Sequence, residues 1–110
     1  MTSVKFLADE NGIFGFEISG HCSKDGDDEA GKIVCAAVSS AAYMAANTIG
    51  EIIGDSMKAD ISDAFMKISV KNPSGKAKAV LEGFELHIEQ LSGQYGNNIK
   101  IIGGANHVKD

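Results

Sequence analysis

His21 and Cys35 are the two side chains whose types and spacing best suit chemistry. His21 lies in a polar loop directly after Gly20, and Cys35 lies within the first turn or so of an expected helix. A thiolate is a strong nucleophile, and the unpaired N–H groups and dipole of a helix N-terminus stabilise it. A neighbouring imidazole can accept the thiol proton and form a thiolate–imidazolium pair. The pair therefore fits nucleophilic catalysis, with Cys35 as the nucleophile and His21 as the general base.

The same residues also fit an inert arrangement, in which Cys35 is a small apolar residue on a helix face. Ser39 is four residues further on and shares that face. Its hydroxyl can support the site or bond to the preceding helical turn. Cys22 is the other cysteine. We expect both cysteines to be free thiols in a reducing compartment. The alternative is a thiol switch, in which a Cys22–Cys35 disulfide turns the site off.

The hydrophobic pattern predicts the elements that must position these residues. Asn11-Gly12 is a hairpin signal between two short apolar runs. Period-two alternation indicates strands, and apolar residues recurring at three and four indicate helices. The expected elements are strands at 4–8 and 13–19, a helix at 32–53, strands at 57–62 and 66–70, a helix at 76–94 and a strand at 99–102. This β-β-α-β-β-α-β order predicts an α+β two-layer sandwich, with a mainly antiparallel sheet and both helices on one face.

Composition narrows the classes of function. The chain of 110 residues allows one domain, with residues 103–110 as an expected flexible tail. Polar residues interrupt the apolar segment 33–53, so we expect a buried helix and no membrane partner.

The net charge is −5 and there is no arginine, which argues against direct nucleic-acid binding. Two cysteines are too few for a four-ligand zinc site, so we expect neither metal nor cofactor. No signal peptide is visible, which favours the cytoplasm.

Two motifs resemble those of the bacterial ribosomal-processing cysteine proteases: the pair Gly20-His21 and the run Ile33-Val34-Cys35-Ala36-Ala37-Val38-Ser39. The resemblance extends over nearly the whole chain. It implies a homodimeric enzyme that removes the N-terminal extension of a large-subunit ribosomal protein and so supports ribosome assembly. The extension belongs to the protein whose tail reaches the peptidyl-transferase centre, and cleavage follows a Phe. Carried over by position, the resemblance implies that His21 is the general base and Cys35 the nucleophile.

Three features depart from that family's pattern. Lys32 stands where the family has an acidic residue, Cys22 stands where it has Ala, and the loop 25–31 is longer than usual. The positive charge of Lys32 favours the thiolate form of Cys35. A carboxylate that orients His21 is then either missing or supplied by Asp27, Asp28 or Glu29.

Two functions remain open on the sequence alone. The first is a cysteine endopeptidase that acts on an unfolded protein tail lying beside the histidine loop. Its oxyanion would be held by backbone N–H groups at the helix start, including that of Cys35. The second is a non-enzymatic, ribosome-associated binding module that uses the same groove and tolerates loss of the Cys35 thiol.

Overall fold

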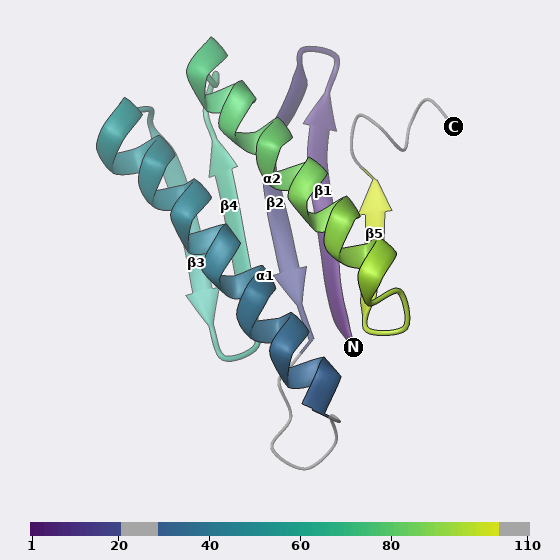
Figure 1. The fold of residues 1–110 in the computed structure, drawn as a ribbon. Coiled ribbons are helices and arrows are strands. Elements are labelled where there is room, and N and C mark those ends of the chain that lie inside the picture. Colours follow the sequence, from purple (N-terminus) through teal and green to yellow (C-terminus); the bar gives the residue numbers. More distant parts are fainter. Residues whose placement is uncertain (21–28, 104–110) are drawn as a thin grey trace.

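A computed structural model of the chain describes residues 1–20 and 29–103 (Figure 1). The elements in chain order are β1 (Thr2–Asp9), β2 (Gly12–Ser19), α1 (Glu29–Asn47), the π-helical segment η1 (Thr48–Ile53), β3 (Met57–Ser62), β4 (Phe65–Val70), α2 (Gly75–Gln94) and β5 (Ile99–Gly103). The predicted order and the α+β class are confirmed. The expected flexible tail lies almost wholly outside the described residues.

The five strands form one mixed sheet in the order β3-β4-β2-β1-β5. The pairs β1–β2, β2–β4 and β3–β4 are antiparallel, whereas β5 runs parallel to β1. Both helices cover the same face of the sheet, with α1 on the side of β3 and β4 and α2 on the side of β1 and β5 (Figure 1). The molecule therefore has two layers, and β3 and β5 are the edges of its sheet.

The core lies between the sheet and the helices. Phe84 of α2 is its aromatic centre, with ring centroids 4.5 Å from Phe16 and 5.9 Å from Phe6. Val34 and Val38 of α1 are fully buried against the same layer. Burial of each large apolar side chain contributes about 1.5–3 kcal/mol. These contacts fix both helices to the sheet and thereby fix the position of Cys35.

The opposite face of the sheet is open and charged. Lys5 pairs with Glu17, Glu17 pairs with Lys67, and Lys67 pairs with Asp60 across four neighbouring strands. Opposite charges on directly facing residues stabilise a sheet modestly and keep its face solvated. The core is therefore confined to the helix side.

A β-bulge interrupts the first hairpin. Leu7 pairs with Gly15, but the next residue, Ala8, pairs with Ile13, so Phe14 is left without a partner. The bulge brings Ile13 into the core, where it is 1% exposed. Gly15 is required beside it, because a Cβ there would meet the backbone carbonyl of Ile68 on β4.

Helix α1 begins at Glu29, three residues before the predicted start, and continues through η1 to Ile53. Together they form a helix of 25 residues that is long and apolar enough to cross a membrane by length and composition. In this fold it packs on the sheet, and 33% of its most apolar window is buried. The expectation of a buried helix is therefore correct for one side of it. Gly54 ends the helix with a left-handed φ of 85° and an N–H that donates to the Ile49 carbonyl.

Gly20 directly follows β2 and precedes His21 in the sequence. Its φ is +103°, a conformation that side chains rarely adopt. A Cβ at this position would also meet the carbonyl oxygen of Met1. Gly12 has a similar φ of +113°, but a Cβ there would have no atom within 4 Å. Both glycines therefore have a positive φ that side chains rarely adopt, but only at Gly20 would an added Cβ also clash with a neighbouring atom.

We predict that Gly20→Ala destabilises the protein by at least about 1 kcal/mol more than Gly12→Ala. A non-glycine residue in such a conformation costs roughly 1–3 kcal/mol, and at Gly20 the clash with Met1 adds to it. Urea denaturation of both variants measures the difference in free energy of unfolding. Equal losses at the two positions would show that the contact with Met1 has no energetic weight.

Candidate active site

Cys35 lies in the second turn of α1 and is half-buried. Only the first four N–H groups of a helix lack an intrahelical acceptor, and in α1 these belong to residues 29–32. We expected Cys35 within the first turn or so of the helix, and the structure places it in the second turn, where its own N–H takes part in the intrahelical hydrogen bonds. The helix dipole also acts mainly on the first turn. Activation of a Cys35 thiolate must therefore come chiefly from a neighbouring side chain.

Cys35 is disulfide-bonded in the structure. The expectation of a free thiol at this position is therefore wrong for the form described. Cys22 is the other cysteine of the sequence and lies outside the described residues. A sulfur held in a disulfide is not a thiolate, so this form lacks the nucleophile that the chemistry requires.

His21 lies outside the described residues, as do Asp27 and Asp28, two of the candidate carboxylates. The structure does describe the residues on either side of this segment. β2 ends at Ser19, which pairs with Ser3 of β1 and with Phe65 of β4. The start of α1 lies at this same end of the sheet (Figure 1). The end of β2, which Gly20 follows, and the start of α1, which leads to Cys35, thus lie at one end of the sheet (Figure 1). Glu29, the third candidate carboxylate, is the exposed first residue of α1.

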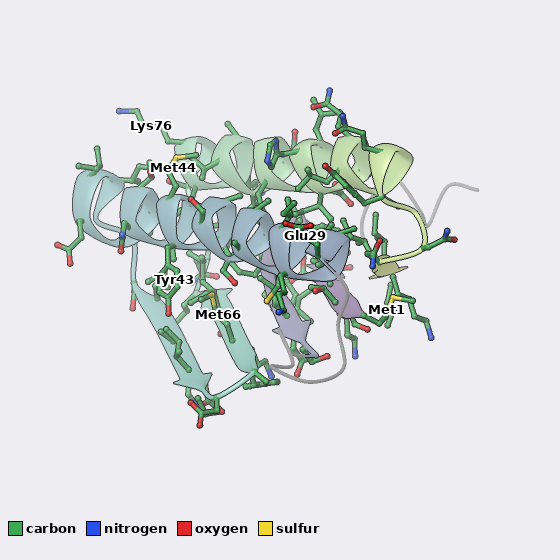
Figure 2. The ribbon with its side chains drawn as sticks, turned by 60° about the horizontal axis from the view of Figure 1, so that its bottom comes forward. Met1, Glu29, Tyr43, Met44, Met66 and Lys76 are labelled. Atoms are coloured by element: carbon green, nitrogen blue, oxygen red, sulfur yellow. The ribbon has the colours of Figure 1, made fainter. Side chains whose placement is uncertain are left out.

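The side of α1 that carries Cys35 also carries Ser39 and Tyr43, because residues four apart lie on one stripe of a helix. Ser39 is half-buried, and Tyr43 is 46% exposed. Tyr43 points toward the β3 side of α1, near Met66 of β4 (Figure 2). Sequence reasoning missed Tyr43, although its spacing of eight residues from Cys35 is the signal that places it on this stripe.

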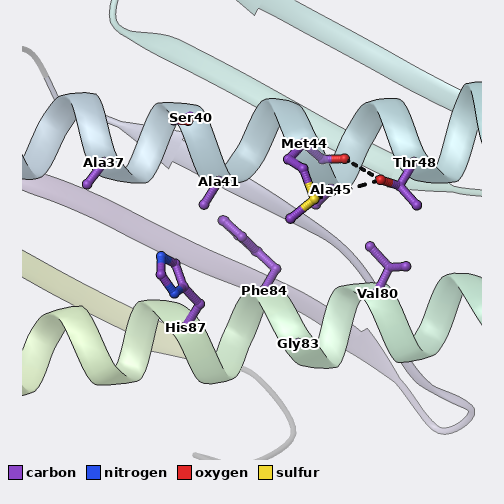
Figure 3. A pocket seen from close by; sticks show the side chains of 10 residues that line it. All are labelled: Ala37, Ser40, Ala41, Met44, Ala45, Thr48, Val80, Gly83, Phe84 and His87. Atoms are coloured by element: carbon purple, nitrogen blue, oxygen red, sulfur yellow. Dashed lines mark hydrogen bonds between the residues drawn. The ribbon is translucent and has the colours of Figure 1, made fainter.

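The other side of α1 borders an apolar groove of about 710 Å³ between the two helices (Figure 3). The groove is wide because the residues that face each other across it are mostly small. Its lining comprises Ala37, Ser40, Ala41, Met44, Ala45 and Thr48 of α1 and η1, with Val80, Gly83, Phe84 and His87 of α2. Cys35 and Ser39 are absent from this lining. The groove and the candidate nucleophile therefore belong to different sides of α1.

In residues 1–20 and 29–103, no three His, Cys, Asp or Glu side chains are grouped closely enough to hold a metal ion. The described part of the site thus offers the sulfur of Cys35, the hydroxyl of Ser39 and the start of helix α1.

Comparison with solved structures shows the fold. The chain matches the S. aureus ribosomal processing protease Prp in complex with a substrate peptide at a TM-score of 0.84 and 17% identity, covering 92% of this chain and 97% of that one. It matches the same protease with a covalently linked product peptide at 0.79 and 18% identity, covering 93% and 98%. SMU.848 from Streptococcus mutans matches at 0.75 and 26% identity, covering 93% and 97%.

No curated protein matches the chain in sequence. The family model described as cysteine protease Prp matches residues 1–100, which include Gly20, Cys35 and every helix of the fold. The protein thus belongs to the Prp family of cysteine proteases.

Proposed function

We propose that this protease removes the N-terminal extension of a large-subunit ribosomal protein in the cytoplasm, with Cys35 as nucleophile and His21 as general base. The observation that carries the assignment is that the end of β2, which Gly20 and His21 follow in the sequence, and the start of α1, the helix of Cys35, lie at one end of the sheet (Figure 1). The family match supports peptide-bond hydrolysis. The substrate class is supported by the S. aureus structures, which are described as a ribosomal processing protease with bound peptides.

In the proposed mechanism, His21 takes the proton of the Cys35 thiol, and the thiolate attacks the scissile carbonyl. Backbone N–H groups at the start of α1 hold the oxyanion. His21 then gives its proton to the departing amine, which leaves an acyl thioester on Cys35. Water hydrolyses the thioester and restores the thiol. Each step uses side chains of this chain and water, so the reaction requires neither metal nor cofactor.

A non-enzymatic binding module is the competing function. Such a module would use the same end of the sheet to hold a ribosomal tail, and it would not need the sulfur of Cys35. The family match disfavours it, and substitution of the dyad separates the two functions.

We predict that Cys35→Ala abolishes cleavage of a peptide spanning the ribosomal-protein extension, and that His21→Ala lowers it by about 10²–10⁴-fold. The double variant should be little worse than Cys35→Ala, because members of one catalytic unit are not additive. Mass spectrometry of the reaction products measures cleavage, and melting temperatures confirm folding. Near-wild-type cleavage by a folded His21→Ala variant would overturn the dyad.

We predict that cleavage by the oxidised protein depends on added dithiothreitol, because the described form holds Cys35 in a disulfide. Cys22→Ser should be active without reductant, since the sequence then contains no second cysteine to pair with Cys35. Initial rates with and without dithiothreitol provide the measurement. Equal rates for the oxidised and reduced wild type would contradict a switch at this sulfur.

We also propose that the protease is a homodimer, as the family resemblance implies, and that the interhelical groove forms the interface. The face of α1 beside the groove is uncharged, and Met44 and Leu86 on the helix layer are 65% and 54% exposed. A two-fold dimer needs one surface that is complementary to itself. In such a dimer, the exposed apolar side chains of each copy would pack into the apolar groove of the other copy.

We predict that Met44→Glu converts the dimer to a monomer, because each interface would then bury two unpaired carboxylates. Light scattering coupled to size-exclusion chromatography measures the molecular mass. Lys5→Glu on the open sheet face is a matched control, which we expect to remain dimeric. A wild type that is monomeric at all concentrations tested would exclude this assembly.

A further inference from the structure

The open face of the sheet gathers lysines although the chain as a whole is acidic. Residues that alternate with the buried residues of a strand point to this face. Together with Lys71, which directly follows β4, they include five lysines and three carboxylates, whereas the whole chain has ten lysines and fifteen acidic side chains. The lysines are Lys5, Lys58, Lys67, Lys71 and Lys100, and the carboxylates are Asp9, Glu17 and Asp60. This face is therefore more positive than the rest of the chain.

Three neighbouring hollows lie along β3, β4 and the loop after β4. The first, of about 180 Å³, is lined by Lys58, Asp60, Lys67 and Ser69. The second, of about 350 Å³, shares Lys58 and Ser69 with the first and adds Lys71 and Phe14. The third, of about 290 Å³, shares Phe14 with the second and extends to Lys78. Because consecutive hollows share lining residues, they form one continuous depression, which we call the lysine track.

The charges of the lysine track suit a chain of anions better than a single small anion. Lys67 and Lys71 are four residues apart along β4, or roughly 13 Å. Lys58 lies between them, opposite Ser69 on the neighbouring strand. Four lysines line the track against two carboxylates. One carboxylate, that of Asp9, accepts a hydrogen bond from the Asn11 N–H at 2.9 Å within the hairpin turn. The track therefore presents a line of positive charges.

Phe14 adds an aromatic ring to this line. The β-bulge leaves Phe14 without a partner on β1, and its half-buried side chain lines both the second and the third hollow. Proteins bind single-stranded nucleic acids with a positively charged groove along the phosphates and aromatic rings on which bases stack. An acidic peptide would need the charges but not the ring. The combination of Phe14 with the lysines therefore favours a nucleic acid whose bases are unpaired.

The composition of the chain excludes less than its total charge suggests. The net charge of −5 averages the lysine-rich face with a more acidic remainder. Arginine supplies the bidentate contacts that read bases, whereas lysine suffices as a point charge beside a phosphate. The lack of arginine therefore argues against recognition of a base sequence and leaves contacts with the phosphate backbone open.

We propose that the lysine track binds single-stranded nucleic acid through its phosphates, with one base stacked on Phe14 and without sequence preference. The track lies on the face of the sheet opposite both helices, whereas Cys35 belongs to the helix layer (Figure 1). The proposal therefore goes beyond the proposed function and does not rest on it. RNA and DNA share the chemistry that the track recognises, so the test includes both.

The test measures binding and its dependence on salt. Fluorescein-labelled oligouridylate and oligothymidylate, each of about 12 nucleotides, are titrated with the wild-type protein, and anisotropy gives the dissociation constants. The logarithm of the association constant should fall with the logarithm of the salt concentration with a slope of about −2 to −3. That slope corresponds to three or four neutralised phosphates at about 0.7 each. The tighter of the two ligands identifies the preferred sugar.

Two variants and a matched control test the residues. Lys58→Gln should weaken binding about threefold to tenfold and make the salt slope shallower by about 0.7. Lys76→Gln makes the same change of charge on the helix layer, away from the sheet (Figure 2), and should leave binding unchanged. Phe14→Leu keeps an apolar side chain but loses the ring, so it should weaken binding about fivefold without changing the slope. Melting temperatures verify that all three variants fold.

Three results would overturn the proposal. The first is no binding by the wild type, or equal dissociation constants for Lys58→Gln and Lys76→Gln at every salt concentration. The second is competition by polyglutamate as strong as that by unlabelled oligonucleotide, with no effect of Phe14→Leu, which would assign the track to an acidic polypeptide. The third is a Lys58→Gln variant that changes the molecular mass in light scattering but not the affinity, which would assign the face to a second copy. Each result leaves cleavage at Cys35 unaffected.

Discussion

The packing of α1 against the sheet is the constraint on which the other features of this molecule depend. Small and β-branched residues face the sheet along the helix, with Val34, Val38, Ala42 and Ala45 all at most 1% exposed. Each side chain of a helix projects at a fixed angle from its neighbours around the helix axis. Burial of these four positions therefore also fixes the direction in which the Cys35 side chain projects. The sulfur cannot be turned toward α2 without removing Val34 and Val38 from the core.

The same constraint separates the two exposed sides of α1. One side meets α2 across the groove that includes Ala41 and Phe84 (Figure 3). The other faces the edge of the sheet, where Tyr43 and Ile61 remain exposed. The helix carries no charged residue from Ile33 to Gly50, so both of these sides are uncharged along most of their length.

Much of the fold could be predicted from the sequence because the spacing of its apolar residues distinguishes strands from helices. The alternation of Met66, Ile68 and Val70 with polar residues predicted β4, and Asn11-Gly12 predicted the first hairpin. Two local features could not be predicted. The bulge at Phe14 interrupts the alternation without a sequence signal of its own, and Glu85 is a carboxylate that is 1% exposed within a helix whose polar residues were expected outside.

The candidate site was predictable in its residue types and less so in its geometry. The run around Cys35 identifies the family, but the start of α1 at Glu29 places the sulfur one turn deeper than expected. Helix starts depend on capping and on the loop before them, and the acidic residues before Ile33 gave no single start signal. Tyr43 was not singled out because one exposed aromatic residue on a helix has no sequence signal of its own.

Trapping the nucleophile with a substrate-derived electrophile is the decisive measurement for the pair of Cys35 and His21. The ribosomal-tail peptide, ending at its Phe with a chloromethyl ketone, is incubated with the reduced protein, and peptide mapping by mass spectrometry locates the adduct. We expect one adduct on Cys35, formed much more slowly in His21→Ala. An adduct on Cys22, or labelling of Cys35 at the same rate in His21→Ala as in the wild type, would contradict the assignment of Cys35 and His21 as the catalytic pair.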